Sequence, residues 1–268
     1  MNDEFERVNQ AAVRLAQSAL QERRLSSYPP GWMVFSAISG GHMYGFPSPD
    51  SDLDIRGCHV LPIDDVIGLR APKETFELMS EYIDGVEVDL VSHDIGKYLR
   101  LLAKNGGYIL EQVLSPLVVE TSDYHTELRE LASRSMSRRV FYHYNGFFRR
   151  QREIVAAEPP LRAKSVLYLF RVALTGIHLL RSGELETDIK KLNEIFGIPY
   201  LPALWSAKFE EREKMKIPDD QRAQFLADAD SLLEQMEAAR DASPLPVDAP
   251  NMDALNDYLI RVRKHAQE

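Results

Sequence analysis

The sequence predicts an α+β fold, in which a small mixed β-sheet with flanking helices is followed by an all-helical part. Before residue 122, short segments at 34–38, 52–60 and 86–91 are continuously apolar or alternate in polarity, which is typical of strands. From Asp123 onward, apolar residues recur at helical spacing instead. We therefore predict two domains, residues 1–122 and residues 123–268.

The elements of the first part follow from where apolar residues recur and where glycine and proline interrupt them. Prolines at 29 and 30 end a first helix, and Gly85 marks a turn before a strictly alternating strand. Phe76–Tyr82 fits a strand or a short helix equally well. In order, we predict a helix at 4–24, a strand at 34–38, a helical turn at 42–44, strands at 52–60 and 86–91, and helices at 93–103 and 108–114.

The second part is predicted to consist of helices separated by breaks that contain proline. Apolar stripes mark helices around 128–148, 167–177 and 225–236, and a last helix is expected at about 252–266. Gly183 suits a helix C-terminus. Prolines at 199, 202 and 218 predict a short irregular segment, and three prolines within 242–250 predict a loop.

Composition and charge exclude several classes of protein. The 268 residues are 44% hydrophobic and 27% charged, as in ordinary globular domains. No stretch approaches the ~20 apolar residues of a membrane span, and the acidic start lacks the apolar core of a signal peptide, so we expect a cytoplasmic protein with no membrane partner. The single cysteine, Cys58, excludes an intrachain disulfide and a multi-cysteine zinc site. A net charge of −9 argues against non-specific binding of nucleic acid over a wide surface, but it is compatible with a local basic groove.

Two acidic side chains in the second predicted strand are candidate metal ligands. Asp52 and Asp54 lie two residues apart, so they point to the same face of a strand. Two carboxylates held together repel each other unless a cation lies between them, and oxygen ligands of this kind suit magnesium. A calcium loop starting at residue 50 is excluded, since its sixth position is Ile55 and its twelfth is Leu61. A solvated loop of acids is the alternative, but the alternation of apolar residues with the acids favours a strand.

The glycines before this strand are a candidate phosphate site. The apolar strand 34–38 stops at Ser39-Gly40-Gly41, where glycine permits backbone angles that other residues resist. Backbone N–H groups at Gly40 and Gly41 can face an anion. The segment from Ser39 to Asp54 could therefore bind phosphates at one end and a metal ion at the other. Phosphoryl and nucleotidyl transfer require both kinds of site.

The same residues carry a resemblance to a known family. Gly40-Gly41, ten intervening residues and then Asp52-Leu53-Asp54 resemble the signature of the DNA polymerase β nucleotidyltransferase superfamily. The longer runs, Gly-Gly-His-Met-Tyr-Gly and Ser-Asp-Leu-Asp-Ile-Arg-Gly, resemble the branch of predicted nucleotidyltransferases associated with an RNA repair pathway. Weaker matches follow at 105–106, 110–111, 115–116 and 171–183. Gly41 departs from the serine that often stands at the second position, which removes a hydroxyl but keeps the backbone N–H.

The resemblance implies a magnesium-dependent nucleotidyltransferase. Such an enzyme transfers a nucleoside monophosphate from a nucleoside triphosphate to a hydroxyl, releases pyrophosphate, and uses two Mg²⁺ ions that Mn²⁺ can replace. It also implies a third carboxylate on a later strand, for which Asp89 is the candidate and Glu87, on the same face, the alternative. The expected roles are catalysis and metal binding by Asp52, Asp54 and Asp89, and nucleotide binding by Ser39, Gly40, Gly41, Ser51, Arg56, Lys164 and Arg171.

Several alternatives stay open at the level of sequence. Lys164 and Arg171 lie on the same face of a predicted helix. The resemblance suggests that this face contacts the triphosphate, and the alternative is a solvent-exposed face. The acceptor is an RNA or tRNA end by family association, whereas a protein or a small molecule fits the residues equally well. A nucleotide-binding regulatory module without turnover is the rival from another class. A phosphohydrolase would need more ligands than the sequence offers.

Overall fold

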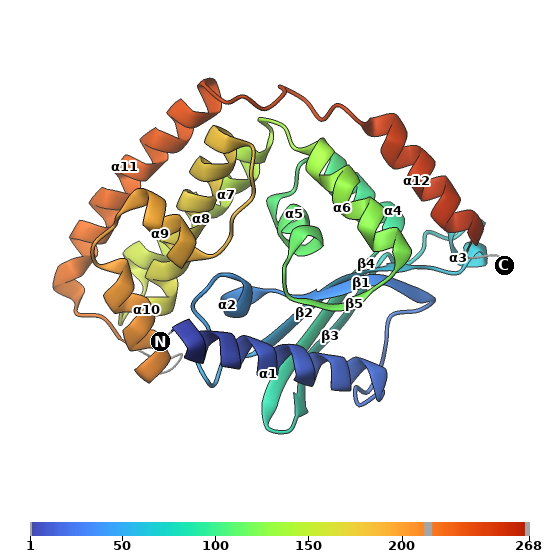
Figure 1. Ribbon diagram of the computed structural model, residues 1–268, viewed down its shortest axis with the longest axis horizontal. Helices are drawn as coiled ribbons and strands as arrows, with labels where there is room; N and C mark the ends of the chain where they lie inside the picture. The colour runs from blue at the N-terminus through green and yellow to red at the C-terminus, as the bar shows by residue number, and fades with distance from the viewer. Residues whose placement is uncertain (1, 212–215, 266–268) are drawn as a thin grey trace. The chain divides into compact units, whose positions relative to one another are not determined.

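The computed structural model of the protein describes residues 2–211 and 216–265 (Figure 1). It is 58% helical with a small mixed five-stranded sheet, which confirms the predicted α+β class. The chain groups into two compact units. The sheet unit comprises residues 6–40, 52–135 and 249–268, and the helical unit comprises residues 1–5, 41–51 and 136–248. The domains 1–122 and 123–268 stay a prediction, because grouping by contact does not say which stretch of chain folds independently.

The sheet joins five strands, all within residues 32–121, in the order β3-β4-β2-β1-β5. β2 and β4 run parallel, and the other neighbouring pairs run antiparallel. The strands predicted at 34–38, 52–60 and 86–91 are confirmed, and the ambiguous segment 76–82 is a strand. The bounds are β1 Trp32–Ile38, β2 Leu53–Val60, β3 Thr75–Ile83, β4 Val86–Asp94 and β5 Val118–Thr121.

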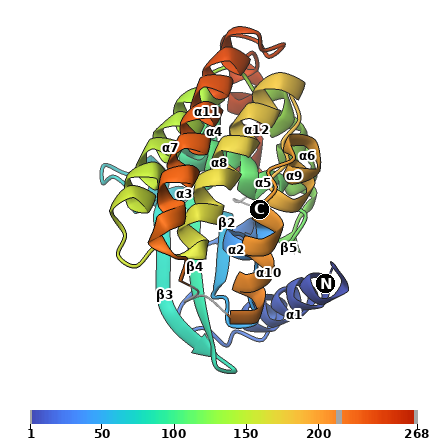
Figure 2. The same cartoon turned by 90° about the vertical axis from the view of Figure 1, so that its left-hand side faces the viewer.

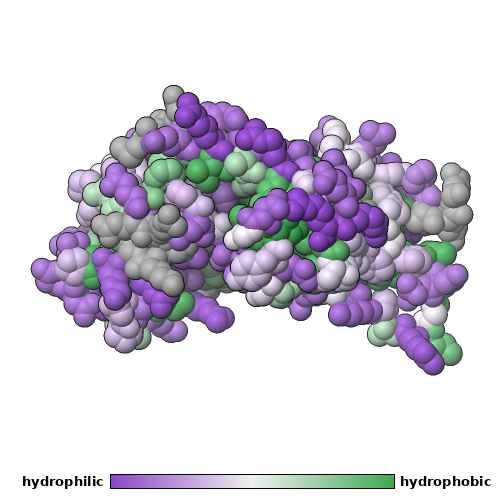
Figure 3. Space-filling model, turned by 90° about the horizontal axis from the view of Figure 1, so that it is seen from below, coloured by the Kyte–Doolittle hydropathy of each residue, from purple (hydrophilic) through white to green (hydrophobic). Residues whose placement is uncertain are grey.

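Helices cover both faces of this sheet (Figure 1). On one face, α1 (Asn2–Gln21) packs Ala12, Ala16 and Ala19 against buried residues of β2 and β4. The outward residues of α1 are mainly polar, in accord with the largely hydrophilic surface seen from below (Figure 3). On the other face lie α4 (Ile95–Ala103), α5 (Gly107–Leu114) and α6 (Asp123–Ser135), and α12 (Met252–His265) packs on α4 and α6. The short α3 (Ile63–Ile67) follows β2.

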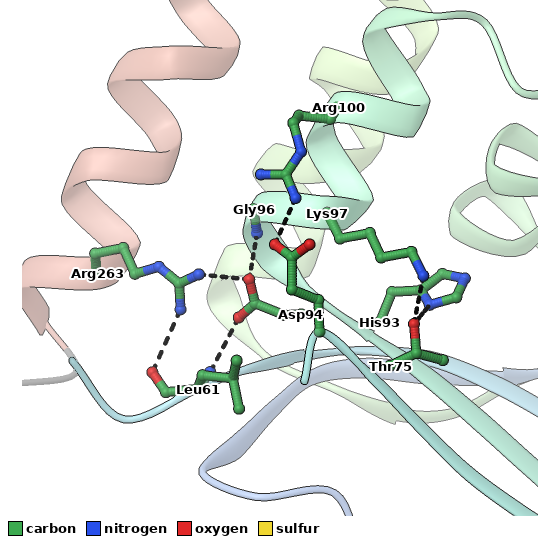
Figure 4. A network of polar contacts seen from close by, with 9 residues as sticks. Leu61, Thr75, His93, Asp94, Gly96, Lys97, Arg100 and Arg263 are labelled. Carbon is green, nitrogen blue, oxygen red and sulfur yellow. Dashed lines mark hydrogen bonds and ion pairs between the residues drawn. The ribbon is translucent and has the colours of Figure 1, made fainter. Parts of the chain in front are cut away.

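A buried ion pair fastens the last helix to the end of β4 (Figure 4). The Asp94 side chain is 1% exposed and accepts a hydrogen bond from Arg263 of α12 at 2.5 Å. Asp94 also caps α4, because it accepts a hydrogen bond from the backbone N–H of Gly96 at 2.9 Å. A further hydrogen bond comes from the backbone N–H of Leu61 at 3.1 Å. The carboxylate therefore has three donors, which is what a buried charge requires.

The helical unit is built around one buried helix, α8 (Ala163–Ser182). Figure 2 shows α7 and α11 beside it. α8 is long and apolar enough to cross a membrane, but 78% of its apolar window is buried inside the protein, as expected of a core helix. The other elements are α2 Gly40–Met43, α7 Val140–Ala157, α9 Ile189–Phe196, α10 Leu201–Glu211, the 3₁₀ helix η1 Asp219–Gln221 and α11 Arg222–Asp241.

Some elements differ from the sequence prediction. The segment around Pro199 and Pro202, predicted to be irregular, contains α10, because Pro202 lies in the first helical turn, where its missing N–H costs nothing. Strand β5 was not predicted, since it has four residues and follows a proline. The predicted helix end at Gly183 is confirmed, with a φ of 78°. The last helix is confirmed to His265, and its predicted final residue lies outside the described residues.

Candidate functional site

Two of the predicted metal ligands are neighbours on adjacent strands of the sheet. In the parallel pair β2–β4, Asp54 lies directly opposite Asp89. The flanking residues Leu53 and Leu90 are buried on the face that packs against α1. Because side chains alternate along a strand, both carboxylates lie on the opposite face, where they are half-buried. The structure thus brings Asp54 and Asp89 together although they are far apart in the sequence.

Gly40 forms a close contact with one of these carboxylates. Its φ of 65° lies in the left-handed region that favours glycine. A Cβ atom at this position would collide with the carboxylate of Asp54. The preceding residue, Ser39, donates its N–H to the carbonyl of Asp54 at 2.8 Å. Ser39 and Gly40 are therefore packed against Asp54 inside the sheet unit. Glycine is favoured at position 40 both by its backbone conformation and by the lack of room for a Cβ atom.

Arg56 places a positive charge beside the two acids. Its Nη2 lies 2.6 Å from Asp54 Oδ1, and the two side chains are 21% and 29% exposed. Its Nη1 donates to the carbonyls of Ile55 at 3.0 Å and Asp89 at 3.3 Å. The guanidinium thus bridges β2 and β4 and offsets the repulsion between their carboxylates. Partial exposure keeps this pair within reach of a ligand.

The two candidates for the third carboxylate differ in their hydrogen bonds. Asp89 Oδ1 accepts the backbone N–H of Ser80 at 2.7 Å. Glu87 accepts from the Ser80 hydroxyl at 2.8 Å through one oxygen and from the Tyr82 hydroxyl at 3.1 Å through the other. Glu87 is thereby tied to β3, whereas Asp89 is the acid in register with Asp54. This geometry favours Asp89 over Glu87.

Asp52 lies just before β2 and is exposed. Its charge is felt by Tyr82, whose pKa is raised first by the hydrogen bond to Glu87, then by the charge of Glu87 and by burial, with Asp52 adding to the effect. Asp52, Glu87 and Tyr82 are therefore close enough to interact electrostatically. Asp52 thus lies within electrostatic range of Tyr82 on the edge strand β3.

The other predicted nucleotide contacts lie in the helical unit. Ser51 Oγ accepts the backbone N–H of Ser48 at 2.9 Å and so closes the loop before Asp52. Lys164 is half-buried on α8. Arg171 is 2% exposed, and its guanidinium carbon lies 3.7 Å from the centroid of the Tyr44 ring.

A Cβ at Gly41 would meet the carbonyl oxygen of Phe46 at an ordinary 3.5 Å. Unlike Gly40, Gly41 therefore stands at a position where the backbone has room for the serine that often replaces it.

The sequence analysis missed a buried cation beside the glycine motif. Lys208 of α10 is 1% exposed, and its Nζ donates to the carbonyl of Phe46 and to Ser48 Oγ, both at 3.1 Å. It holds the loop that follows Gly41 within the helical unit. No sequence signal marks it, because it lies in the segment that prolines made look irregular.

Within residues 2–211 and 216–265, no group of three or more His, Cys, Asp or Glu side chains is already gathered as a metal site. The arrangement offers two in-register carboxylates instead. Mg²⁺ is commonly held by one or two carboxylates, with waters and substrate phosphates completing its shell. Carboxylate oxygens suit such a hard cation.

Comparison with known proteins supports the resemblance in the motifs. The chain is 34% identical over 155 residues to the uncharacterized protein MJ0002 of Methanocaldococcus jannaschii, covering 58% of this chain and 63% of that protein. It therefore spans less than two thirds of the length of that relative. It is 26% identical over 186 residues to the uncharacterized protein YcgL of Bacillus subtilis, covering 68% of this chain and 70% of that protein.

A family model covers nearly the whole chain. The match extends over residues 8–261, which include both acidic strands, the glycine motif and the helical unit up to α12. The model is that of polymerase β-like proteins associated with RNA repair. The chain belongs to the RNA repair pathway DNA polymerase beta family.

Proposed function

We propose that the protein is a magnesium-dependent nucleotidyltransferase that transfers a nucleoside monophosphate from a nucleoside triphosphate to a hydroxyl acceptor. The observation that carries this proposal is the register of β2 and β4, which sets Asp54 beside Asp89 with Gly40 packed on Asp54. Family membership supports the same chemistry. Neither carboxylate lies in the apolar core, since both side chains are half-buried.

Asp52, Asp54 and Asp89 are the residues that would hold the metal ions. Bound there, Mg²⁺ or Mn²⁺ would neutralise phosphate charge and polarise the α-phosphate. Arg56 balances the carboxylates in the absence of a cation, and its half-buried guanidinium is a further candidate contact for phosphate oxygens. Ser39, Gly40, Gly41 and Ser51, with Lys164 and Arg171, remain the proposed nucleotide contacts.

The proposed reaction is an in-line displacement at the α-phosphorus. The acceptor oxygen forms a bond to phosphorus, the bond from that phosphorus to the bridging oxygen of the β-phosphate breaks, and pyrophosphate leaves. The proton of the acceptor hydroxyl passes to the Asp89 carboxylate, which serves as general base. Ser80 N–H already holds one oxygen of that carboxylate, so Asp89 is oriented before substrate binds.

We propose the hydroxyl of an RNA or tRNA end as the acceptor. The support is the association of the family with RNA repair. The alternative acceptors are hydroxyl groups of proteins and of small molecules, and the experiment below distinguishes them from RNA.

The experiment is a transfer assay with each nucleoside triphosphate labelled at the α-phosphate. The protein is incubated with Mg²⁺ and, in separate reactions, with total cell RNA, cell protein and a small-molecule extract. We expect label in the RNA fraction and a stoichiometric release of pyrophosphate. Asp54→Asn should abolish transfer, and Asp89→Asn should slow it by about a hundredfold, as loss of a general base does. Asp64→Asn, a change in an exposed acid of α3, is the matched control.

The products separate the competing functions. Label in the protein or small-molecule fraction keeps the transferase and corrects the acceptor. Release of the γ-phosphate without transfer of the α-label would identify a phosphohydrolase. Tight triphosphate binding with no release of any phosphate would identify a binding module and refute the proposed activity.

A further inference from the structure

A bulge in the edge strand of the sheet lies directly opposite Asp89. In the antiparallel pair β3–β4, Leu78 is opposite Leu90 and Glu81 is opposite Val88, and the register shifts between them. Two residues of β3, Met79 and Ser80, therefore face the single residue Asp89 on β4. Such a bulge adds one residue to a strand and re-aims the groups beside it. β3 is one of the two edge strands in the order β3-β4-β2-β1-β5 (Figure 2).

Ser80 adopts an unusual backbone conformation within this bulge. Its φ is 57°, in the left-handed region that L-residues other than glycine seldom occupy. Ser80 is exposed, so side-chain packing does not impose this conformation. The result is that its backbone N–H donates to Asp89 Oδ1 at 2.7 Å instead of to a carbonyl of the neighbouring strand.

The same residue acts differently on the two acids of β4. The Ser80 hydroxyl donates to Glu87 Oε1 at 2.8 Å, and Tyr82 donates to Glu87 Oε2 at 3.1 Å. Both oxygens of Glu87 thus accept from β3. Among the described contacts, Asp89 accepts the Ser80 backbone N–H through Oδ1. This donor belongs to the main chain and cannot rotate away, so it fixes the position of the carboxylate. A main-chain donor is more rigid than a hydroxyl because its direction is set by the fold.

We infer that Ser80 is a positioning residue, whose left-handed bulge conformation holds one oxygen of the Asp89 carboxylate from the β3 side and so fixes the orientation of this divalent-cation ligand. The inference rests on the proposed function, because it assigns a role within the same site. It also assigns Glu87 to the β3 edge and not to the metal. Outer hydrogen bonds of this kind fix the orientation of metal ligands and are needed for full affinity.

The test uses two substitutions at one position that differ only in the backbone they allow. Ser80→Gly and Ser80→Val both remove the hydroxyl. Glycine accepts a φ of 57° at no cost, whereas a β-branched residue resists it and favours a regular strand. The readout is Mn²⁺ binding to the full chain, measured by electron paramagnetic resonance with and without a non-hydrolysable nucleoside triphosphate.

We expect Ser80→Val to weaken Mn²⁺ binding by about tenfold, the lower end of the range for such outer contacts. Ser80→Gly should stay within twofold of the wild-type affinity. Tyr82→Phe, which removes a donor to Glu87 alone, is the matched control and should also leave the affinity unchanged. Circular dichroism of each variant verifies that the sheet is intact. If Ser80→Val does not fold, deletion of Met79, which removes the extra residue of the bulge, replaces it.

Equal Mn²⁺ affinities for the glycine and valine variants would overturn the inference. So would a loss of affinity in Glu87→Gln with none in Asp89→Asn, or the lack of any binding that depends on Asp54. The proposed function fails in a different way. Asp54-dependent Mn²⁺ binding without any nucleotidyl transfer would refute the activity, yet the valine-to-glycine difference in affinity would still support the role of Ser80.

Discussion

Gly40 is the residue at which the backbone comes closest to a candidate metal ligand. Its φ is 65°, and a Cβ there would collide with the Asp54 carboxylate. We therefore predict that Gly40→Ala destabilises the fold by about 1–2 kcal/mol through its backbone conformation. It should also displace the Asp54 side chain and lower Mn²⁺ affinity by about tenfold or more. Urea unfolding and Mn²⁺ titration measure the two effects separately.

The matched control is Gly85→Ala in the turn between β3 and β4. Gly85 has a φ of 82°, but a Cβ there would meet nothing within 4 Å. This variant should show a similar loss of stability with unchanged Mn²⁺ affinity. If both variants bind Mn²⁺ normally, the packing of Gly40 on Asp54 has no functional role.

His59 should make the stability of the protein depend on pH. It is fully buried on β2, its Nδ1 lies 2.8 Å from Ser92 Oγ, and its Nε2 has no hydrogen-bond partner among the described residues. Burial lowers its pKa from 6.5 to about 4, against the opposing charge of Asp94. Since the unfolded chain binds the proton first, stability is complete above pH 6.5 and falls as the pH drops toward 4.

The expected slope is up to about 1.4 kcal/mol per pH unit for this group. His93, whose pKa is also lowered to about 4 by burial, adds to the slope in the same range. Urea unfolding at a series of pH values measures it, and His59→Gln should reduce the slope even if it lowers stability at every pH. An unchanged slope in that variant would show that His59 does not carry the effect.

At the scale of elements, Arg263 anchors α12 to the sheet unit through the buried Asp94. The Arg263 side chain is 14% exposed and that of Asp94 is 1% exposed (Figure 4). Removing one partner of a buried ion pair leaves an uncompensated charge, so Arg263→Ala should cost about 3–5 kcal/mol of unfolding free energy. Hydrogen exchange should report the loss first at amides of α12 and at the N-terminus of α4, which Asp94 caps.

Arg261→Ala is the control on the same helix. Arg261 pairs with Glu127, but the two side chains are 56% and 38% exposed, so the pair is worth about 0–1 kcal/mol. Comparable losses for the two variants would show that burial does not distinguish the pairs, and that α12 is held mainly by Leu255, Tyr258 and Val262.

The elements that the sequence predicted correctly are those whose pattern is local. β4 and the first half of β2 alternate between buried and half-buried residues, so both strands could be predicted from polarity. β3 was ambiguous, because the bulge at Met79 and Ser80 breaks its alternation. α10 was missed, since a proline in a first helical turn looks the same in sequence as a proline in a loop.

The candidate site could be predicted only in part, because local sequence patterns do not show which strands are neighbours in the sheet. Each acid could be assigned to a face of its own strand, but the pairing of Asp54 with Asp89 depends on β2 and β4 being parallel neighbours. That pairing places β4 between β2 and β3, an order that no local pattern encodes. The roles of Ser80 and Lys208 were likewise hidden, since a positive φ at serine and a buried lysine leave no mark in the sequence.

At the scale of the whole molecule, the charge is unevenly distributed along the chain. Residues 138–181 contain nine Lys or Arg and two Glu, in a protein of net charge −9. Three of these arginines pair with acids of the helical unit outside the segment, namely Arg139 with Asp248 at 3.1 Å, Arg149 with Glu237 at 3.9 Å and Arg152 with Asp230 at 2.6 Å.

The whole molecule should be stabilised by its proposed substrate only when metal is present. A ligand at about 100 times its Kd adds about 2.7 kcal/mol to the free energy of unfolding. For a chain of this size, that corresponds to a rise of about 5–10 °C in Tm of the transition that contains the sheet unit. Thermal unfolding with each of the four non-hydrolysable triphosphates, with and without Mg²⁺, measures this rise and identifies the base.

Asp54→Asn is the control variant. Its Tm should not change when Mg²⁺ and triphosphate are added, because it lacks the central ligand of the site. A shift that is the same without Mg²⁺, or that persists in Asp54→Asn, would mean that the nucleotide binds elsewhere and that the two carboxylates serve another ligand.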